Sequence, residues 1–233
     1  TWFVNDTYTS ADSFTYAGGS DTSWGDGSRT RPYRSVAKAM QKVKQGDTVY
    51  VDAGLYADTY VVVSSVETAA FKIDTDYITI IGKDSNATVI DPPGASTDET
   101  IYGIYADTQT GLVIRNLGVT GASGGIAFFN VTSSTISGDS LCSNDVGVYL
   151  ANSSAGNTVT GVTARYNSIG IYIDSGSSNV ITNNQADSNS NFGISIDSGA
   201  SNTIRGNTAD SNSVAGIYLN SSRSNTLETN AAR

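Results

Sequence analysis

A short phrase that begins with glycine returns every 23 residues in the second half of this chain. Its four copies are Gly147-Val148-Tyr149-Leu150, Gly170-Ile171-Tyr172-Ile173, Gly193-Ile194-Ser195-Ile196 and Gly216-Ile217-Tyr218-Leu219. Two weaker copies begin at Gly103 and Gly125, 22 residues apart. A fixed period of about 20–50 residues is typical of stacked repeats in which each unit packs only on its neighbours. The sequence therefore predicts a solenoid.

Each repeat contains short apolar stretches separated by turn residues, and no repeat can bury its own apolar side alone. Side chains alternate along a strand, so we expect Ile171 and Ile173 to point inward and Tyr172 to point outward. Consecutive coils would lie about 4.8 Å apart, which is the usual spacing between strands. These features predict an all-β fold of about eight coils over residues 47–233, regular from about residue 100.

Asparagine recurs with the same period in two further registers. They are Asn157, Asn179, Asn202 and Asn225, and Asn144, Asn167, Asn189 and Asn212. Asparagine tolerates left-handed backbone at turns, and its amide can bond to the amides of the coils above and below. We therefore expect asparagine ladders inside the turns of the solenoid.

The first 46 residues have a different character and are predicted to form a strand, a polar loop and a helix. The strand is Trp2–Val4, and Pro32 then opens an amphipathic pattern with Val36, Met40 and Val43 on one face. Gly46 ends this pattern, so the sequence predicts a helix of about three turns over residues 32–44 with a basic outer face.

The charge and composition exclude several classes of function. The 233 residues carry a formal net charge of −9. This charge disfavours nucleic acid, whose phosphates need clustered Lys and Arg, and disfavours a bare acidic polysaccharide unless a metal ion bridges the two. A single cysteine, Cys142, excludes an internal disulfide, and the absence of histidine excludes His-based triads and His metal ligands. No apolar run is long enough to enter and span a membrane.

The opening segment resembles an N-terminal pattern of secreted β-helix proteins, on Asp26-Gly27-Ser28, Arg31-Pro32-Tyr33, Gly46-Asp47-Thr48 and Gly54-Leu55-Tyr56. With the later repeats, the chain resembles a right-handed parallel β-helix of the pectate-lyase-like superfamily, and the repeats resemble those of the parallel β-helix repeat and NosD-like families. The resemblance implies that residues 32–44 plug the N-terminal end of the solenoid as a capping helix. The Asn-Thr-Asp, Gly-His-Gly and Arg-Ile-Lys motifs of polygalacturonases are not present.

A tyrosine register forms the first candidate site. Tyr105, Tyr149, Tyr172 and Tyr218 share one position of the repeat, interrupted by Ala127 and Ser195. If the isoleucines point inward, these rings stand on one outer face and offer a flat platform for sugar rings. The alternative is ordinary cross-strand packing of residues that favour strands.

An acidic register is the candidate metal site. Asp174 and Asp197 lie 23 residues apart, with Asp107 and Asn220 in equivalent positions. Two carboxylates about 4.8 Å apart would repel each other and could bind calcium. A solvated turn is the alternative. A further register, Arg165, Asp187, Asp210 and Arg233, predicts surface salt bridges between neighbouring coils.

The early, irregular coils would hold an active site if the protein is an enzyme. The candidates for a catalytic base are Lys72, Lys83 and Arg115, and those for metal ligands are Asp74, Asp76 and Asp107. A base must lie close to its target proton and be unprotonated at the working pH. A structural role for all six residues is the alternative.

The leading hypothesis is an extracellular or cell-surface β-solenoid module with a structural, assembly or carbohydrate-binding role and without catalysis. The coils run in register to Arg233, so we expect an open end that docks onto a neighbouring subunit or continues in a longer chain. The alternative is a polysaccharide lyase or C5-epimerase that acts on uronate-containing polymers. A copper-related periplasmic role, implied by the NosD-like resemblance, has only Cys142 and Met40 as soft ligands.

Overall fold

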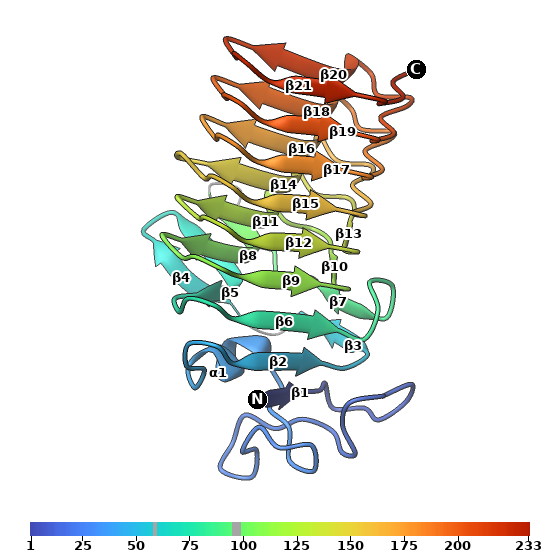
Figure 1. Ribbon diagram of the computed structural model, residues 1–233. Coiled ribbons are helices and arrows are strands. Elements are labelled where there is room, and N and C mark those ends of the chain that lie inside the picture. The colour runs from blue at the N-terminus through green and yellow to red at the C-terminus, as the bar shows by residue number, and fades with distance from the viewer. Residues whose placement is uncertain (58–59, 95–98) are drawn as a thin grey trace.

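The computed structural model describes residues 1–57, 60–94 and 99–233 and forms a stack of β coils (Figure 1). Within these residues the coils build three sheets, here called A, B and C. Sheet A contains β1 (Trp2–Val4), β2 (Thr48–Val51), β6 (Thr79–Gly82), β9 (Val113–Arg115), β12 (Thr135–Ser137), β15 (Thr158–Thr160), β17 (Val180–Thr182), β19 (Thr203–Arg205) and β21 (Thr226–Glu228). Sheet B contains β3 (Gly54–Tyr56), β7 (Thr88–Ile90), β10 (Gly118–Val119) and β13 (Ser140–Leu141).

Sheet C contains the longest strands of the regular coils. It contains β4 (Val61–Ser64), β5 (Glu67–Ile73), β8 (Thr100–Asp107), β11 (Gly124–Phe129), β14 (Val146–Ala151), β16 (Ile169–Asp174), β18 (Phe192–Asp197) and β20 (Ala215–Asn220). The strands of all three sheets pair in parallel, apart from the antiparallel hairpin of β4 and β5. The all-β parallel β-helix predicted from the sequence is confirmed.

Residues at equivalent positions of successive repeats pair with each other in the sheets. Val148, Ile171, Ile194 and Ile217 are consecutive partners across sheet C, so like residues stack on like. Ile171 and Ile173 are fully buried in the main core, as the alternation of side chains predicts. The core is therefore one continuous apolar column along the axis of the stack.

The glycine of the repeated phrase is needed where the chain turns into sheet C. A Cβ atom on Gly170 would lie 2.6 Å from the carbonyl oxygen of Gly193 in the next coil, and one on Gly147 would lie 2.5 Å from that of Gly170. Backbone atoms of the neighbouring coil cannot move aside without breaking the stack. The glycine phrase therefore marks the closest approach between successive coils.

Asparagine ladders hold the turns together, as predicted for both registers. The backbone N–H of Asn179 donates to Asn202 Oδ1 at 2.9 Å, and that of Asn167 donates to Asn189 Oδ1 at 3.0 Å. In each case the acceptor belongs to the coil that follows in the sequence. Since these groups are buried, the ladders satisfy donors that water cannot reach.

A third ladder was not predicted. It consists of Asn184, Asn207 and Asn230, and Asp139 occupies the same position two coils earlier. Asp139 is 1% exposed, and its Oδ1 accepts from the backbone N–H of Leu117 at 2.8 Å. Its Oδ2 is buried without a partner in the described part of the chain. Burial raises the pKa of the Asp139 carboxyl group to about 7.

The helix near the N-terminus is much shorter than predicted. α1 comprises only Val36–Met40, with Ser35 as its N-cap, so the prediction of three turns over residues 32–44 is wrong and a capping helix of that length is not confirmed. Tyr33 bridges to Val4 of β1 instead of joining the helix, because its backbone N–H donates to Phe3. At the other end, Lys42 bonds back to Ala39 in a tight turn.

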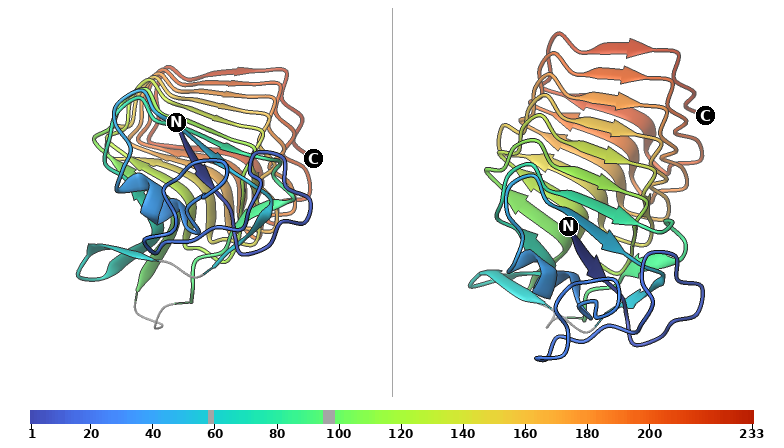
Figure 2. Two further views of the ribbon diagram at one scale, coloured as in Figure 1. Left: turned by 90° about the horizontal axis from the view of Figure 1, so that it is seen from below. Right: turned by 60° about the horizontal axis from the view of Figure 1, so that its bottom comes forward.

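The polar N-terminal loop lies across the first coil, at the bottom of Figure 1 and in front in the left view of Figure 2. Asp52, fully buried after β2, anchors this loop. Its carboxylate accepts the backbone N–H groups of Ser13, Phe14 and Thr15 at 2.7–2.8 Å. One buried carboxylate thus orders a segment that has little apolar content of its own.

Candidate functional site

The outer face of sheet C places the predicted tyrosines in one column. Register pairing brings together Lys72 and Tyr105 at one end, Tyr149 and Tyr172 in the middle, and Ser195 and Tyr218 at the other. Tyr172 points outward because its neighbours Ile171 and Ile173 fill the core. The column crosses every regular coil of the stack.

Aromatic rings follow one another along this face over four successive coils. The ring centroids of Tyr102 and Tyr105 lie 5.3 Å apart, those of Tyr105 and Phe129 5.3 Å, and those of Phe129 and Tyr149 5.5 Å. Tyr149 and Tyr172 stack at 5.2 Å with planes 6° from parallel. We call these five residues the aromatic row.

At the two positions where the column lacks a tyrosine, a phenylalanine from a neighbouring position of the repeat contacts the tyrosines of the column. Ala127 is fully buried, and the ring of Phe129 contacts both tyrosines that flank it. Ser195 is 1% exposed, and Phe192 of the same strand stacks on Tyr218 at 4.6 Å. Sequence reasoning missed both phenylalanines, although each lies on the same short strand as the small residue.

The tyrosines do not form the open platform that the sequence predicts. Tyr105 is only 8% exposed, because Val61 and Val63 of the β4–β5 hairpin and the ring of Phe129 pack around its cluster. Tyr149 and Tyr172 cover one face of each other, and both remain partly exposed. Tyr218 is the most exposed of the four, at 39%. The accessible part of the column thus begins at Tyr149.

Carboxylates border the aromatic row and accept the tyrosine hydroxyl groups. Tyr172 Oη donates to Asp197 Oδ2 at 3.0 Å, and Tyr149 Oη donates to Asp174 Oδ2 at 3.4 Å. At the hairpin end, Tyr102 Oη donates to Glu67 at 3.0 Å. Burial, followed by these carboxylates, raises the pKa of Tyr149 and Tyr172 above the usual range. The hydroxyl groups are therefore donors at neutral pH.

Asp174 and Asp197 are direct neighbours on sheet C, as predicted. Asp107 lies three coils before Asp174. It pairs with Phe129 and accepts from Asn130 Nδ2 at 3.1 Å. Within residues 1–57, 60–94 and 99–233, no group of three or more His, Cys, Asp or Glu side chains could hold a metal ion. A calcium site on Asp174 and Asp197 stays a prediction.

The three candidate bases do not converge. Lys72 lies on sheet C beside Tyr105 and forms an ion pair of 2.9 Å with Asp74. Lys83 follows β6 of sheet A, and its ammonium group donates to the carbonyl oxygen of Ala11. Arg115 is exposed on β9 of sheet A. Only Lys72 is therefore part of the sheet C face.

The two remaining candidate metal ligands, Asp74 and Asp76, do not lie at one site. Asp76 accepts the backbone N–H of Thr110 at 3.0 Å and so fixes a turn. Burial, followed by Asp107, raises the pKa of Tyr105 to about 12, and Asp74 contributes to the same shift. Asp74 and Asp107 thus lie close enough to Tyr105 to share its electrostatic environment.

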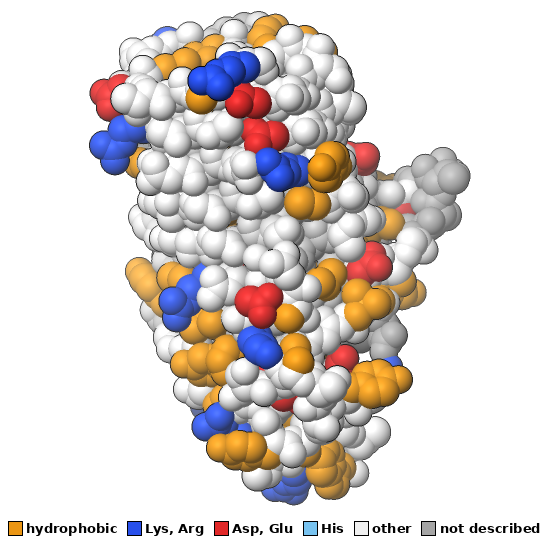
Figure 3. Space-filling view, turned by 90° about the vertical axis from the view of Figure 1, so that its right-hand side faces the viewer, with side chains coloured by type: hydrophobic (Ala, Val, Ile, Leu, Met, Phe, Trp, Pro, Cys, Tyr) orange, Lys and Arg blue, Asp and Glu red, His pale blue; other side chains and the backbone are white. Residues whose placement is uncertain are grey.

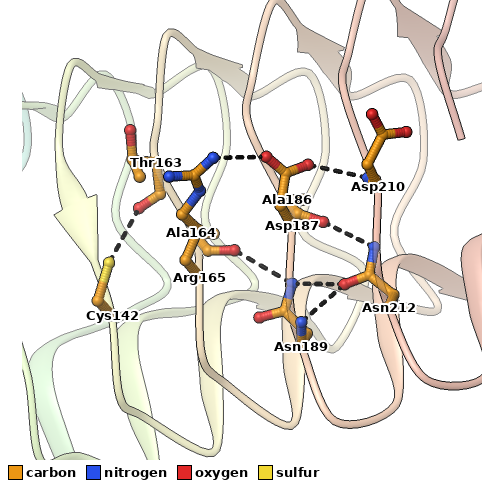
Figure 4. A network of polar contacts seen from close by, with 9 residues as sticks. All are labelled: Cys142, Thr163, Ala164, Arg165, Ala186, Asp187, Asn189, Asp210 and Asn212. Carbon is orange, nitrogen blue, oxygen red and sulfur yellow. Dashed lines mark hydrogen bonds and ion pairs between the residues drawn. The ribbon is translucent and has the colours of Figure 1, made fainter. Parts of the chain in front are cut away.

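The predicted salt bridges are formed in part. Figure 4 shows Arg165 pointing toward Asp187, and the ion pair measures 2.8 Å. Asp187 also accepts the backbone N–H of Asp210, and no ion pair joins Asp210 to Arg233 within the described residues.

Cys142 lies one coil before Arg165, with Sγ 3.9 Å from the carbonyl oxygen of Thr163. The side of the molecule in Figure 3 is mostly uncharged, with acidic and basic side chains next to each other.

The sequence of residues 46–232 matches a family described as "Periplasmic copper-binding protein (NosD)". The chain belongs to the NosD family. No curated protein matches this NosD-family chain at a significant level. Among the described residues, no helix is long and apolar enough to cross a membrane.

Solved structures share the fold of this NosD-family chain. Pectate lyase Pel9A superposes with a TM-score of 0.70 at 18% identity, covering 92% of this chain and 55% of that one. An alginate lyase from Paenibacillus sp. str. FPU-7 has a TM-score of 0.65 at 17% identity, covering 83% and 73%. The periplasmic alginate epimerase AlgG has a TM-score of 0.62 at 18% identity, covering 90% and 57%. The chain thus spans about half of the length of the pectate lyase.

The residues of this NosD-family chain do not fit a copper site. Copper in proteins is bound mainly by Cys, Met and His side chains, and this chain has one Cys, one Met and no His. Met40 lies in α1, which packs on the core beside β1 and β5. Cys142 follows β13 and contacts Ser140 and Thr163. The two soft ligands belong to different coils of the stack.

Proposed function

We propose that this protein is an exported β-solenoid module that binds a polysaccharide along the outer face of sheet C without transforming it. The observation that carries the proposal is the accessible part of the aromatic row, where Tyr149 stacks on Tyr172 at 5.2 Å and carboxylates accept both hydroxyl groups. The periplasmic description of the NosD family supports export. An extracellular or cell-surface location belongs to the same proposal.

The chemistry of the face suits sugars. Aromatic rings pack against the apolar C–H surfaces of pyranoses, and carboxylate oxygens accept hydrogen bonds from sugar hydroxyl groups. Oδ2 of Asp174 and Oδ2 of Asp197 each accept one tyrosine hydroxyl group and keep acceptor capacity, because a carboxylate oxygen can accept more than one hydrogen bond. Oδ1 of Asp197 is buried. The strands hold these groups rigidly, so little conformational entropy is lost when a ligand binds.

The protonation states of the candidate groups support a binding role over catalysis. A general base must accept a proton at the working pH. The tyrosine pKa values are raised, so their hydroxyl groups stay protonated, and the Lys72 ammonium group is paired with Asp74. The protons of Tyr149 and Tyr172 are donated to Asp174 and Asp197, so the hydroxyl oxygens of these tyrosines can accept hydrogen bonds from a glycan.

The test is calorimetric titration of the protein with a panel of neutral, acidic and amino-sugar oligosaccharides. We expect at least one to bind, and Tyr172→Ala to weaken that binding by about tenfold or more. Tyr166→Ala is the matched control, because Tyr166 is 66% exposed and lies outside sheet C. Equal binding by both variants would rule out the sheet C face, and an unresponsive panel would overturn the proposal.

A polysaccharide lyase or epimerase acting on uronate polymers is the second candidate. The contact of Lys72 with Asp74, next to Tyr105 on the face, is the specific observation that favours it. β-Elimination creates an unsaturated sugar that absorbs ultraviolet light, and epimerisation exchanges the proton at C5 with solvent deuterium. A signal that Lys72→Ala abolishes, and that Lys83→Ala and Arg115→Ala leave unchanged, would establish catalysis at this face.

A further inference from the structure

Most of the charged side chains on sheet C are negative. Across its eight strands, the described charged residues are four carboxylates and one ammonium group: Glu67, Asp107, Asp174, Asp197 and Lys72. Lys72 is already paired with Asp74 just beyond β5. The face that carries the aromatic row therefore offers surplus negative charge to a ligand.

This asymmetry belongs to the face and is not a property of every sheet. Sheet A exposes Arg115 on β9 and Arg205 on β19, together with Glu228 on β21. The arginines of the strands thus lie on the sheet that lacks the aromatic row. The whole chain has a net charge of −9, which adds a long-range field of the same sign.

A groove continues the acidic character at the hairpin end of the aromatic row. It has a volume of about 390 Å³, and Glu67, Glu99, Tyr60 and Val62 line it. No Lys or Arg is among its described lining residues. Glu67 joins the groove to the row, since it accepts from Tyr102 Oη. Carboxylates therefore lie at both ends of the row, with Glu67 at the groove and Asp174 and Asp197 beside Tyr149 and Tyr172.

We infer that the ligand of the sheet C face is a polysaccharide with protonated amino groups, a polymer of deacetylated amino sugars. This inference rests on the function proposed above and names its substrate class. Complementary charge attracts such a polymer, and the same carboxylates repel a polyuronate. Pectate and alginate, after which the pectate lyase and the alginate lyase are named, are polyanions, so selection of an amine would set this chain apart from both enzymes.

Three hexasaccharides test the inference by calorimetric titration in mildly acidic buffer: glucosamine, N-acetylglucosamine and galacturonic acid. They carry positive, no and negative charge, and the first two share one backbone. We expect the glucosamine hexamer to bind about tenfold more tightly than its acetylated form, and the galacturonate hexamer not to bind. Raising the salt concentration from ~50 to ~500 mM should remove most of the advantage of the amine, because surface charges are then screened.

Two double variants separate local charge from net charge. Asp174→Asn with Asp197→Asn should weaken binding of the glucosamine hexamer about tenfold more than it weakens binding of the acetylated hexamer. Asp145→Asn with Glu228→Gln changes the net charge equally, at two exposed positions outside the sheet C strands, and should have little effect.

Each contrary result has a distinct meaning. Equal affinity for the two glucosamine-based hexamers would overturn the inference and keep the proposed function. Tighter binding of galacturonate, with or without calcium, would also overturn it. If none of the three hexamers binds, glycan binding itself is wrong and the inference falls with it.

Discussion

Tyr172 Oη donates to Asp197 Oδ2 at 3.0 Å, a bond that ties one coil to the next across 25 residues of sequence. Removing only the hydroxyl group by Tyr172→Phe keeps the stack on Tyr149, so we expect a loss of about 0.5–1 kcal/mol in the free energy of unfolding. Tyr172→Ala also removes the ring contact and should cost about 2–3 kcal/mol. Urea denaturation measures both values. The exposed Tyr166 provides the control, and equal losses for Tyr166→Phe and Tyr172→Phe would contradict this account.

The buried carboxyl group of Asp139 should make stability depend on pH. Its folded pKa of about 7 lies above the ordinary value of 3.8, so the folded state binds the proton more tightly than the unfolded state does. The contribution of this proton is full below the unfolded pKa and is lost as the pH rises to about 7. The difference corresponds to on the order of 4 kcal/mol, and we expect unfolding measured from pH 4 to 8 to report it.

Asparagine at position 139 should remove this dependence. In the same ladder, Asn184 Nδ2 donates to the carbonyl oxygen of Val159 at 2.9 Å, a bond that an ionised carboxylate cannot make. We therefore expect Asp139→Asn to be more stable than the parent at pH 8 and nearly equal to it at pH 4. The reciprocal change, Asn184→Asp, should introduce a similar pH dependence. Parallel pH profiles for the parent and Asp139→Asn would refute the assignment.

Removing one ladder asparagine should leave buried donors without acceptors. Asn202→Ala deprives both the backbone N–H and the side-chain amide of Asn179 of their shared acceptor, and Asn179 is fully buried. We expect a loss of about 2–4 kcal/mol, from the unsatisfied groups and the cavity. Asn191→Ala is the control, because Asn191 is exposed and bonds only to Ser168 Oγ through its side chain. A comparable loss in the control would show that the ladder has no special role.

The close approach at the repeated glycine leads to a steric prediction. The added methyl group of Gly170→Ala would collide with the carbonyl oxygen of Gly193, so we expect a loss of about 1–3 kcal/mol. Gly94→Ala should be nearly neutral, because a Cβ atom there meets no atom of the described residues within 4 Å. Thermal unfolding followed by circular dichroism compares the two. A neutral Gly170→Ala would mean that the coils can separate locally without loss of stability.

The periodic part of the sequence predicted the architecture because each residue there meets a copy of itself. Ile171 is partnered by Val148 and Ile194, so one spacing determines register, burial and core together. Two asparagine ladders followed from the same argument. The third could have been found too, since Asn184, Asn207 and Asn230 are each 23 residues apart.

Contacts between different positions of the repeat could not be read from periodicity. Phe129 covers Ala127, and Phe192 stacks on Tyr218, because aromatic side chains reach across to neighbouring columns. The helix at residues 32–44 was overestimated for a similar reason. Pairing of Tyr33 with β1 overrides a local helical pattern, and nothing in the local sequence reveals that tertiary bond.

In the asparagine ladders, each backbone donor precedes its side-chain acceptor in the sequence. Asn144, Asn167 and Asn189 each donate a backbone N–H to a side chain that lies one coil later in the chain. A ribosome makes the donor before the acceptor, so every new coil is incomplete until about 22 further residues have emerged. Each coil therefore satisfies its buried backbone donors only when the next coil has formed.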